Sequence, residues 1–287
     1  MSKIKFMVDS TSDIPKEVAE KYNVSVVGLS MTFEDGTYTD WYELSGKAFY
    51  DKLRASKAAV TTSQPPMSAI ADEMKAILEQ GYDEIIFYTI SSKGSGTYNC
   101  ANLAKESVLE SYPQAKIHIV DTLTYSYFIT MALLRGVQLY EEGKSGGKIV
   151  EESVQYLKSL DVVFLVDTLT YLERGGRINK ATMILGNMLN IKPVLSVRNG
   201  IIDTVDKFRG SKNVIRKLIE KAKSFGYNPQ NPDFAIVHSD AEEKANELLT
   251  AIREENPNAE PVLFGMLGGT VGAHTGPGVV ALFFVRE

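Results

Sequence analysis

Residue types that often carry chemistry are scarce in this sequence of 287 residues, which has one cysteine, one tryptophan and three histidines. The single cysteine, Cys100, excludes a disulfide within the chain and a zinc site built on cysteines. The histidines are too dispersed to form a metal-ligand pattern, so we expect no metal site. This cysteine usage fits a reducing, cytoplasmic environment.

Long apolar runs and an excess of one charge are also missing. No stretch approaches the roughly 18 apolar residues of a membrane span, and the first residues, MSKIKFMVDSTSD, lack the apolar segment and cleavage site of a signal peptide. The 31 basic residues are scattered among 36 acidic ones, and the net charge is −5. We therefore expect a soluble cytoplasmic protein with no transmembrane segment and no nucleic-acid partner.

The sequence does contain enough apolar material for two folded lobes, because hydrophobic residues make up 44% of a chain that is longer than one typical domain. Short apolar runs alternate with helical patterns, which predicts an α/β fold with largely parallel sheets. The predicted strands are 4–8, 24–32, 84–89, 116–120, 162–166, 192–197, 234–238, 262–267 and 279–285. The predicted helices are 66–80, 97–111, 126–142, 211–225 and 241–254.

Two turn signals are present, and the second predicts a hairpin, so we expect mixed sheets. They are Glu34-Asp35-Gly36 and Arg198-Asn199-Gly200, each between strand-like runs. The polar, glycine-rich stretch EEGKSGGK at 141–148 predicts a loop and a lobe boundary near residue 150. The predicted lobes are therefore 1–155 and 156–287.

Three predicted loops are rich in small hydroxyl side chains. They are DSTSD at 9–13, TTSQPP at 61–66 and SSKGSGT at 91–97. In an open α/β sheet, ligands bind beyond the carboxyl ends of the strands, and free N–H groups with hydroxyls at a helix N-terminus can hold a carboxylate or a phosphate. Helix capping alone explains any one of these loops, but the three together favour an anion site.

Nucleotide and hydrolase motifs compete with this interpretation. Residues 94–99 lack the third glycine of G-x-G-x-x-G, and the sequence around 143–145 lacks the first glycine of a phosphate-binding loop. Ser95 lies on a predicted strand-to-helix turn and His274 follows it in the chain, as in serine hydrolases. The local pattern KGSGT is not the G-x-S-x-G of a nucleophile elbow. A hydrolase of lipid-like esters and a small-molecule-binding module remain the alternatives.

His274 has the most suggestive setting of the three histidines. It lies in GGTVGAHTGPG at 268–278, where dense glycine allows the backbone to approach a ligand closely. His118 alternates within a strand pattern and is expected to be structural. His238 ends a predicted strand and is expected to cap the next helix.

Two arginine-containing segments and one apolar stretch each fit two different roles. TLTYLERGGRI at 168–178 places Arg174 and Arg177 around a Gly-Gly turn, which fits either an anion site or a helix C-terminus with a glycine stop. The role of Arg209, in KFRGS, has similar alternatives, and one of them is contact with a partner. The methionine-containing stretch 181–195 fits either the lining of an apolar tail pocket or a packed core.

Taken in order, the motifs resemble the DegV family, the bacterial fatty-acid-binding proteins that serve as the lipid-presenting subunit of fatty acid kinase. The motifs are DSTSDI, TSQPP, ISSKGSGTYN, DT at Asp121, TLTYLERGGRI, IKPVL and GGTVGAHTGPG. The resemblance covers essentially the whole chain. It implies two α/β lobes with one long-chain fatty acid between them and no cofactor.

The resemblance also implies roles for individual residues. Hydroxyl groups of the first lobe would hold the carboxylate, the C-terminal lobe would supply an apolar tail-binding region, and Arg209 would contact a partner. The expected fatty-acid-binding residues are Thr62, Ser95, His274, Gly94, Gly96, Ser92 and Arg174. Gly94 departs from the family pattern, which often has leucine there, and this difference bears on the space near the headgroup.

The family resemblance further implies a partner. A separate kinase catalytic subunit would phosphorylate the bound fatty acid from ATP, and an acyltransferase would pass the acyl phosphate into phospholipid synthesis. The chain itself would be a carrier and not an enzyme, which fits its lack of a phosphate-binding loop motif.

Overall fold

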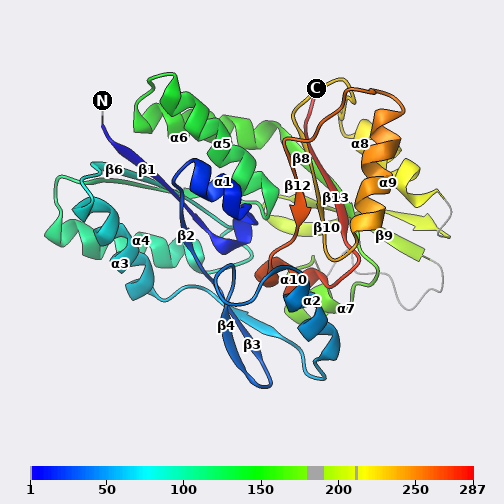
Figure 1. Cartoon of the computed structure of the whole chain (residues 1–287), viewed down its shortest axis with the longest axis horizontal. Helices are drawn as coiled ribbons and strands as arrows, with labels where there is room; N and C mark the ends of the chain where they lie inside the picture. Colours follow the sequence, from blue (N-terminus) through cyan, green and yellow to red (C-terminus); the bar gives the residue numbers. More distant parts are fainter. Residues whose placement is uncertain (1, 180–190, 211–212) are drawn as a thin grey trace. The chain divides into compact units, whose positions relative to one another are not determined.

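The computed structural model describes residues 2–179, 191–210 and 213–287. These residues form two units, each built from its own layers of helices and strands (Figure 1). The first unit contains Met1–Glu43 and Thr62–Lys158, and the second contains Leu44–Thr61 and Ser159–Glu287. The sequence-based division had placed residues 44–61 in the first lobe, whereas in the structure they group with the second.

The first unit is built on a four-stranded parallel sheet with the order β2-β1-β6-β7. Its central strands, β1 and β6, are buried at every position, as is typical of parallel strands that helices cover on both faces. The strands are β1 (Ile4–Asp9), β2 (Ser25–Val27), β6 (Glu84–Thr89) and β7 (Lys116–Asp121). The helices are α1 (Lys16–Lys21), α3 (Met67–Glu79), α4 (Thr97–Ser111), α5 (Tyr127–Glu141) and α6 (Gly146–Ser159).

Successive side chains of each strand point to opposite faces of this sheet. Met7 and Phe87 belong to the core that α3 and α4 cover. Tyr88 points the other way: its hydroxyl lies 2.8 Å from Ser153 Oγ of α6 and against Gly136 of α5. Because side chains on both faces of the sheet are buried under helices, these strands have continuous apolar runs in the sequence.

A small three-stranded sheet, β4-β3-β5, is attached to the first unit. Its strands are β3 (Ser30–Phe33), β4 (Gly36–Thr39) and β5 (Thr61–Ser63), and the predicted Glu34–Gly36 turn joins β3 to β4 in an antiparallel hairpin. The single strand predicted over 24–32 is wrong, because β2 and β3 belong to different sheets. The chain leaves β2 at Gly28, whose Cα lies against the backbone of Asp40.

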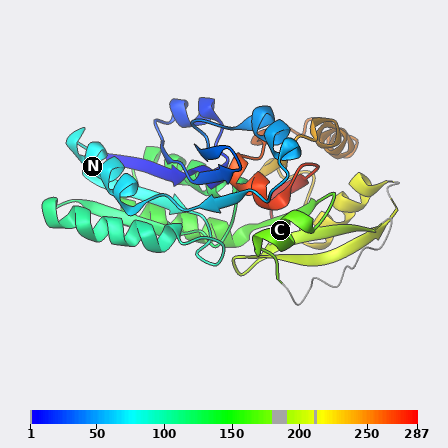
Figure 2. The same cartoon turned by 90° about the horizontal axis from the view of Figure 1, so that it is seen from below.

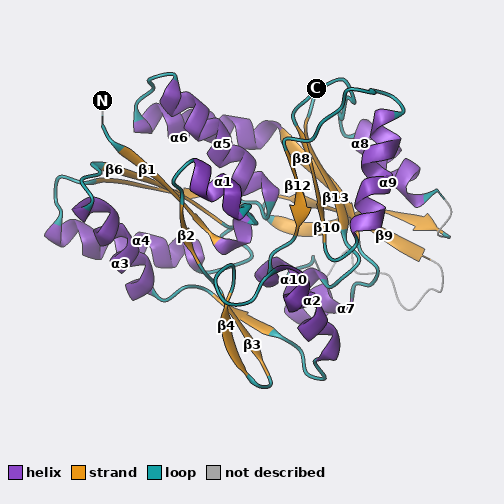
Figure 3. Ribbon diagram, in the orientation of Figure 1, coloured by secondary structure: helices purple, strands orange, loops and turns teal. Residues whose placement is uncertain are grey.

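The second unit is built on a six-stranded mixed sheet with the order β10-β9-β8-β13-β11-β12, in which only β11 and β12 pair in parallel. Helices α8 and α9 lie side by side on one face, where they share a core with β8, β11 and β13 (Figure 3). The strands are β8 (Leu160–Leu165), β9 (Ile191–Arg198), β10 (Ile201–Arg209), β11 (Phe234–His238), β12 (Leu263–Met266) and β13 (Val280–Val285). The helices are α2 (Gly46–Ala55), α7 (Thr170–Gly175), α8 (Val214–Ser224), α9 (Glu242–Arg253) and α10 (Gly269–Thr275). The predicted fold class of two α/β lobes with parallel and mixed sheets is confirmed.

The hairpin predicted at residues 198–200 is confirmed by the long β9–β10 ribbon (yellow-green in Figure 2). Asn199 and Gly200 both have left-handed backbone angles, with φ of 52° and 81°. This pair of angles matches the two-residue turn that Asn-Gly favours between antiparallel strands.

Both glycine-rich stretches, the predicted loop at 141–148 and the segment around His274, contain parts of helices. Residues 146–148 of the glycine-rich EEGKSGGK stretch begin α6, and Gly269–Thr275 of the second glycine-rich stretch form α10. Residues 181–190 of the apolar stretch lie outside the described part of the chain, and Ile191 begins β9. Among the described residues, no helix has the length and apolar character needed to cross a membrane.

The hairpin angles predict the effect of a substitution at Gly200. Gly200→Ala should lower the midpoint of urea denaturation, because a side chain in the left-handed region costs about 1–2 kcal/mol. The matched control is Gly147→Ala, whose Cβ would meet no atom within 4 Å in helix α6. This control should leave the midpoint unchanged or raise it slightly, and equal losses for the two variants would contradict the hairpin geometry.

Candidate functional site

The hydroxyl-rich loops of the first unit follow the carboxyl ends of β1, β6 and β7. Because these strands are parallel, their carboxyl ends lie at the same edge of the sheet. Residues 10–12 form a short 3-10 helix, η1 (Ser10–Ser12), and they are all buried. This edge is therefore where the structure concentrates polar side chains inside the first unit.

A buried carboxylate, Asp9, fixes the first two loops. Its side chain is 0% exposed. Its Oδ2 accepts a hydrogen bond from Ile90 N at 2.8 Å, and its Oδ1 accepts one from Thr11 N at 3.0 Å and another from the Thr11 hydroxyl. Burial raises the pKa of Asp9 to about 6 despite these hydrogen bonds. Asp9 thus ties the end of β1 to the end of β6.

A second aspartate, Asp121, joins the loop after β6 to the loop after β7. Its Oδ1 accepts hydrogen bonds from Ser92 N at 3.0 Å and from Leu123 N at 3.1 Å. The backbone adds a direct bond from Ser91 N to Thr124 O at 2.9 Å. The Asp-Thr motif at the end of β7 is therefore a structural clamp on the serine-rich loop.

Ser95 lies at the start of α4 and makes local hydrogen bonds. Its Oγ is 2.9 Å from Thr97 Oγ1 and accepts from Thr97 N at 3.3 Å. Gly96, and not Ser95, is the N-cap residue of α4, and no side chain of the N-cap residue caps this helix, so the Ser95 bonds form a local serine turn just before it. The side chain stays half-buried, as does that of Ser92.

The segment that carries Thr62 packs against the same loop. The Gln64 side chain lies against Gly96 Cα, where any Cβ would overlap it, and Cys100 Sγ contacts Pro65 O at 3.5 Å. Thr62 itself is half-buried on β5. The structure therefore brings the TTSQPP and SSKGSGT segments together within the first unit, as expected from their hydroxyl content.

In the second unit, glycines let large side chains approach the segment around His274. A Cβ on Gly272 would lie 2.8 Å from Phe49 Cε1 and 3.0 Å from Tyr50 Cζ, both on α2. The Tyr50 hydroxyl also donates to Leu267 O at 3.1 Å. These contacts explain why residues 44–61 belong to the second unit.

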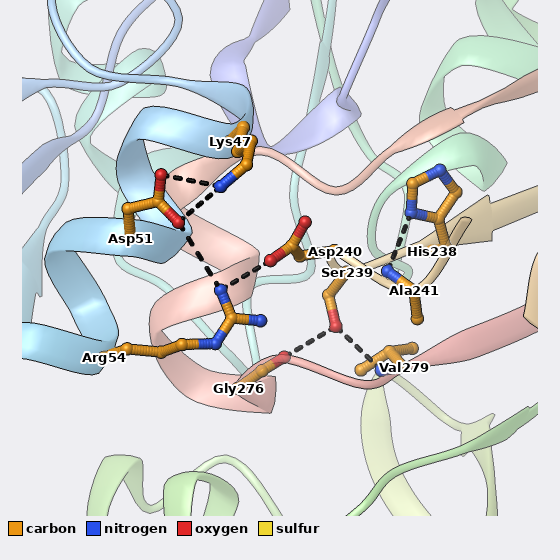
Figure 4. A network of polar contacts seen from close by, with 9 residues as sticks. All are labelled: Lys47, Asp51, Arg54, His238, Ser239, Asp240, Ala241, Gly276 and Val279. Carbon is orange, nitrogen blue, oxygen red and sulfur yellow. Dashed lines mark hydrogen bonds and ion pairs between the residues drawn. The ribbon is translucent and has the colours of Figure 1, made fainter. Parts of the chain in front are cut away.

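The loop after β11 anchors both α2 and the glycine-rich segment (Figure 4). Asp240 Oδ2 forms an ion pair with Arg54 Nη1 of α2 at 2.5 Å. Ser239 Oγ donates to Gly276 O at 2.7 Å and accepts from Val279 N at 2.7 Å. The turn at Ser239 and Asp240 therefore holds both α2 and residues 276–279, which follow α10.

The other two histidines have the roles that the sequence predicts. His238 Nδ1 accepts from Ala241 N at 3.3 Å, just before α9, so it caps that helix. His118 Nε2 lies 2.7 Å from Glu84 Oε1 on the neighbouring strand. Within the described ranges, no group of three or more His, Cys, Asp or Glu side chains has the arrangement of a metal site.

His274 sits in α10 with its ring against Gly175 of α7, since a Cβ at position 175 would overlap Nδ1. Burial, reinforced by the positive charge of Arg177, lowers the pKa of His274 to about 4. The imidazole is therefore neutral at pH 7 and carries one donor and one acceptor nitrogen. A carboxylate placed beside it would raise its pKa by stabilising the protonated form.

Arg174 and Arg209 are both exposed side chains of the second unit. Arg174 lies in the last turn of α7, and Gly176, with a left-handed φ of 66°, ends the helix. The segment therefore forms a helix C-terminus with a glycine stop, one of the two interpretations that the sequence allowed. Arg209 ends β10, which is an edge strand of its sheet.

The structure therefore places Ser92, Gly94, Ser95 and Gly96 in one loop at the carboxyl edge of the first unit's sheet. Thr62 lies on β5 of the small sheet, and the residues that follow it contact Gly96 and Cys100 through Gln64 and Pro65. His274 and Arg174 belong to the second unit, on α10 and α7. Their assignment to ligand binding stays a prediction. Sequence reasoning did not give Asp9 and Asp121 their clamping roles, although each stands at the carboxyl end of a strand.

Comparison with known proteins identifies the family. Residues 3–287 match the family model described as "Uncharacterised protein, DegV family". A DegV domain-containing protein of Clostridium perfringens is 32% identical over 284 residues, which cover 99% of each chain. The chain belongs to the DegV family.

Solved structures of similar proteins extend this result to the fold. A DegV family protein of Thermus thermophilus, described by its fatty acid binding, is 30% identical with a TM-score of 0.88, and the match covers 100% of each chain. A stearic-acid-binding protein of Eubacterium ventriosum is 27% identical with a TM-score of 0.90, covering 100% of this chain and 98% of that one. Proteins with this fold and clear sequence similarity therefore bind fatty acids.

The low pKa of His274 has a measurable consequence in the ligand-free protein. Unfolding returns the imidazole to a pKa near 6.5, so the unfolded state binds the proton between pH 6.5 and 4 while the folded state does not. The stability contributed by neutral His274 is present above pH 6.5 and is lost as the pH falls toward 4. Wild-type protein should therefore lose more stability than His274→Gln between pH 7 and 4.5 in urea denaturation.

Proton NMR checks the same point directly. The His274 ring should titrate near pH 4, assigned by its absence in the His274→Gln spectrum, and Arg177→Gln should raise its pKa. Titration of His274 near pH 6.5 would contradict the burial of this ring.

Proposed function

We propose that this chain binds one long-chain fatty acid and presents its carboxylate to a separate ATP-dependent kinase. The observation that carries the proposal is similarity over the whole chain to solved proteins that bind fatty acids, among them a DegV family protein. The hydroxyl groups gathered at the sheet edge of the first unit support it, because they supply the donors that a carboxylate requires.

In the proposed headgroup site, the Thr62 and Ser95 hydroxyls donate to the carboxylate and the neutral His274 imidazole donates a further hydrogen bond. The backbone at Gly94 and Gly96 approaches the ligand closely, with Ser92 beside them. The exposed guanidinium of Arg174 contributes positive charge. Such donors are needed because a buried carboxylate without partners is strongly penalised.

The hydrocarbon tail would supply most of the affinity. Burying each CH₂ is worth about 0.8 kcal/mol, so a tail of roughly fifteen carbons offers on the order of 10 kcal/mol before ordering costs. The headgroup loops then need to provide only orientation and charge compensation. We expect the ligand to stay bound through purification.

Electrostatics favours a carrier over a serine hydrolase. A hydrolase would need His274 as a general base with a pKa near the working pH, whereas burial and Arg177 lower its pKa to about 4. The Ser95 hydroxyl is engaged with Thr97. These two features make proton abstraction from Ser95 unfavourable.

The proposed partner is a kinase catalytic subunit that transfers phosphate from ATP to the bound carboxylate. The acyl phosphate would then be used by an acyltransferase in phospholipid synthesis. This division of labour fits a sequence without a phosphate-binding loop motif. The purified chain incubated with ATP alone should therefore form no acyl phosphate.

Lipid extraction tests the binding proposal. Purified protein should release close to one fatty acid per chain, identified by mass spectrometry. With delipidated protein, Thr62→Ala and Ser95→Ala should each weaken palmitate binding by about tenfold, since each removes a hydrogen bond to a charged group. Thr37→Ala, which removes an exposed hydroxyl from β4 of the same small sheet, should bind like wild type.

Two outcomes would count against this proposal. Protein that is consistently empty, and does not bind palmitate after delipidation, would remove its basis. Turnover of a long-chain ester that Ser95→Ala abolishes would instead favour the hydrolase.

Charge reversal tests the proposed partner contact. Arg209→Glu should slow the formation of acyl phosphate by a fatty acid kinase catalytic subunit while leaving palmitate affinity unchanged. The difference from wild type should shrink at high salt, because exposed charges are screened. Lys57→Glu, also an exposed cation of the second unit, is the control, and equal slowing by the two variants would contradict a specific role for Arg209.

A further inference from the structure

Tyr125, in the loop after β7, lies directly against Gly94 of the proposed headgroup loop. A Cβ built on Gly94 would lie 2.8 Å from Tyr125 Cε1 and 3.0 Å from Cζ, and closer still to the hydroxyl. No side chain fits at position 94 unless the tyrosine moves. Gly94 therefore admits the phenol end of Tyr125 to the loop that carries Ser92 and Ser95.

The surrounding backbone holds Tyr125 firmly in this position. Leu123 and Ser126, on either side of it, both have left-handed angles, with φ of 52° and 58°. Non-glycine residues adopt such angles only when their surroundings enforce them. Here the Asp121 carboxylate holds Leu123 N, and Ser126 N donates to Thr11 O at 2.9 Å.

The tyrosine is also largely removed from water. Tyr125 is 8% exposed, and its loop is bonded to the serine-rich loop through Ser91 N and Thr124 O. A phenol group in such a position offers a rigid ring edge and an O–H donor at low entropic cost, because few rotatable bonds must be ordered.

We propose that Tyr125 is a positioning residue for the ligand carboxylate, and that Gly94 is required to admit it. The proposal rests on the proposed fatty-acid function. The Tyr125 hydroxyl donates to the carboxylate beside the Ser95 hydroxyl, and the ring edge limits how far the headgroup enters the loop. The pair thereby selects a carboxylate over an uncharged headgroup of the same chain length.

Discrimination between an acid and an alcohol tests this role. Palmitate and hexadecanol share a sixteen-carbon chain, so packing of the tail affects both equally. In delipidated protein, Tyr125→Phe should weaken palmitate binding by about tenfold and leave hexadecanol binding within about twofold of wild type. The ratio of the two dissociation constants is the readout, because a purely structural role would change both together.

Tyr88→Phe is the matched control. It also removes a buried tyrosine hydroxyl of the first unit, one that lies 2.8 Å from Ser153 Oγ. This variant should lower thermal stability but leave the acid-to-alcohol ratio unchanged. A ratio that changes equally in the two variants would overturn the proposal.

Gly94→Ala tests the steric half of the argument. The added methyl group should displace Tyr125 and reduce the acid-to-alcohol ratio by itself, so that Tyr125→Phe added to Gly94→Ala causes little further loss. Additive losses in this double-mutant cycle would overturn the proposed coupling. If Gly94→Ala does not fold, the ratio measured for Tyr125→Phe alone decides the role of Tyr125.

The results also separate this inference from the function on which it rests. Wild-type protein that binds neither palmitate nor any other fatty acid overturns both. Wild-type protein that binds palmitate tightly, with an unchanged ratio in Tyr125→Phe, overturns only the role of Tyr125.

Discussion

The loops of the first unit depend on one buried carboxylate, Asp9. It accepts hydrogen bonds from Ile90 N and Thr11 N, so the loops that follow β1 and β6 share a single anchor inside the protein. Burial is the main cause that raises its pKa, with a smaller contribution from the charge of Asp40, and the cost of holding a carboxylate there is offset by the amides that it satisfies. Asp121 repeats this arrangement one strand further along, where it fixes Ser92 and Leu123.

Because Asp9 and Asp121 hold these loops rigidly, the hydroxyl groups that the loops carry are also oriented. From the sequence, helix capping and ligand binding are alternatives for these hydroxyls. In the structure the Ser95 hydroxyl lies just before the N-cap residue Gly96 and is held in a defined orientation by Thr97. A donor that is already oriented loses little entropy on binding. In the second unit, Ser239 and Asp240 give the segment around His274 comparable order.

Much of the fold could be predicted because local signals were strong. Strands β6 and β11 begin and end where apolar runs place them, helix α4 ends before Pro113 as expected, and Asn199-Gly200 forms the expected turn. Glycine caused one error: Gly146, in a stretch predicted as a loop, begins α6, where it packs against the Glu84 side chain despite its low helix propensity. The contacts of Tyr125 with Gly94, and of α2 with α10, join residues far apart in the chain, so local patterns did not contain them.

The central proposal is that the Thr62 and Ser95 hydroxyls, together with the His274 imidazole, hold a carboxylate. A crystal structure of the protein grown with palmitate tests it most directly. The account predicts one palmitate per chain, with carboxylate oxygens about 3 Å or less from Thr62 Oγ1, Ser95 Oγ and a His274 ring nitrogen. A palmitate whose carboxylate lies away from all three groups would contradict it.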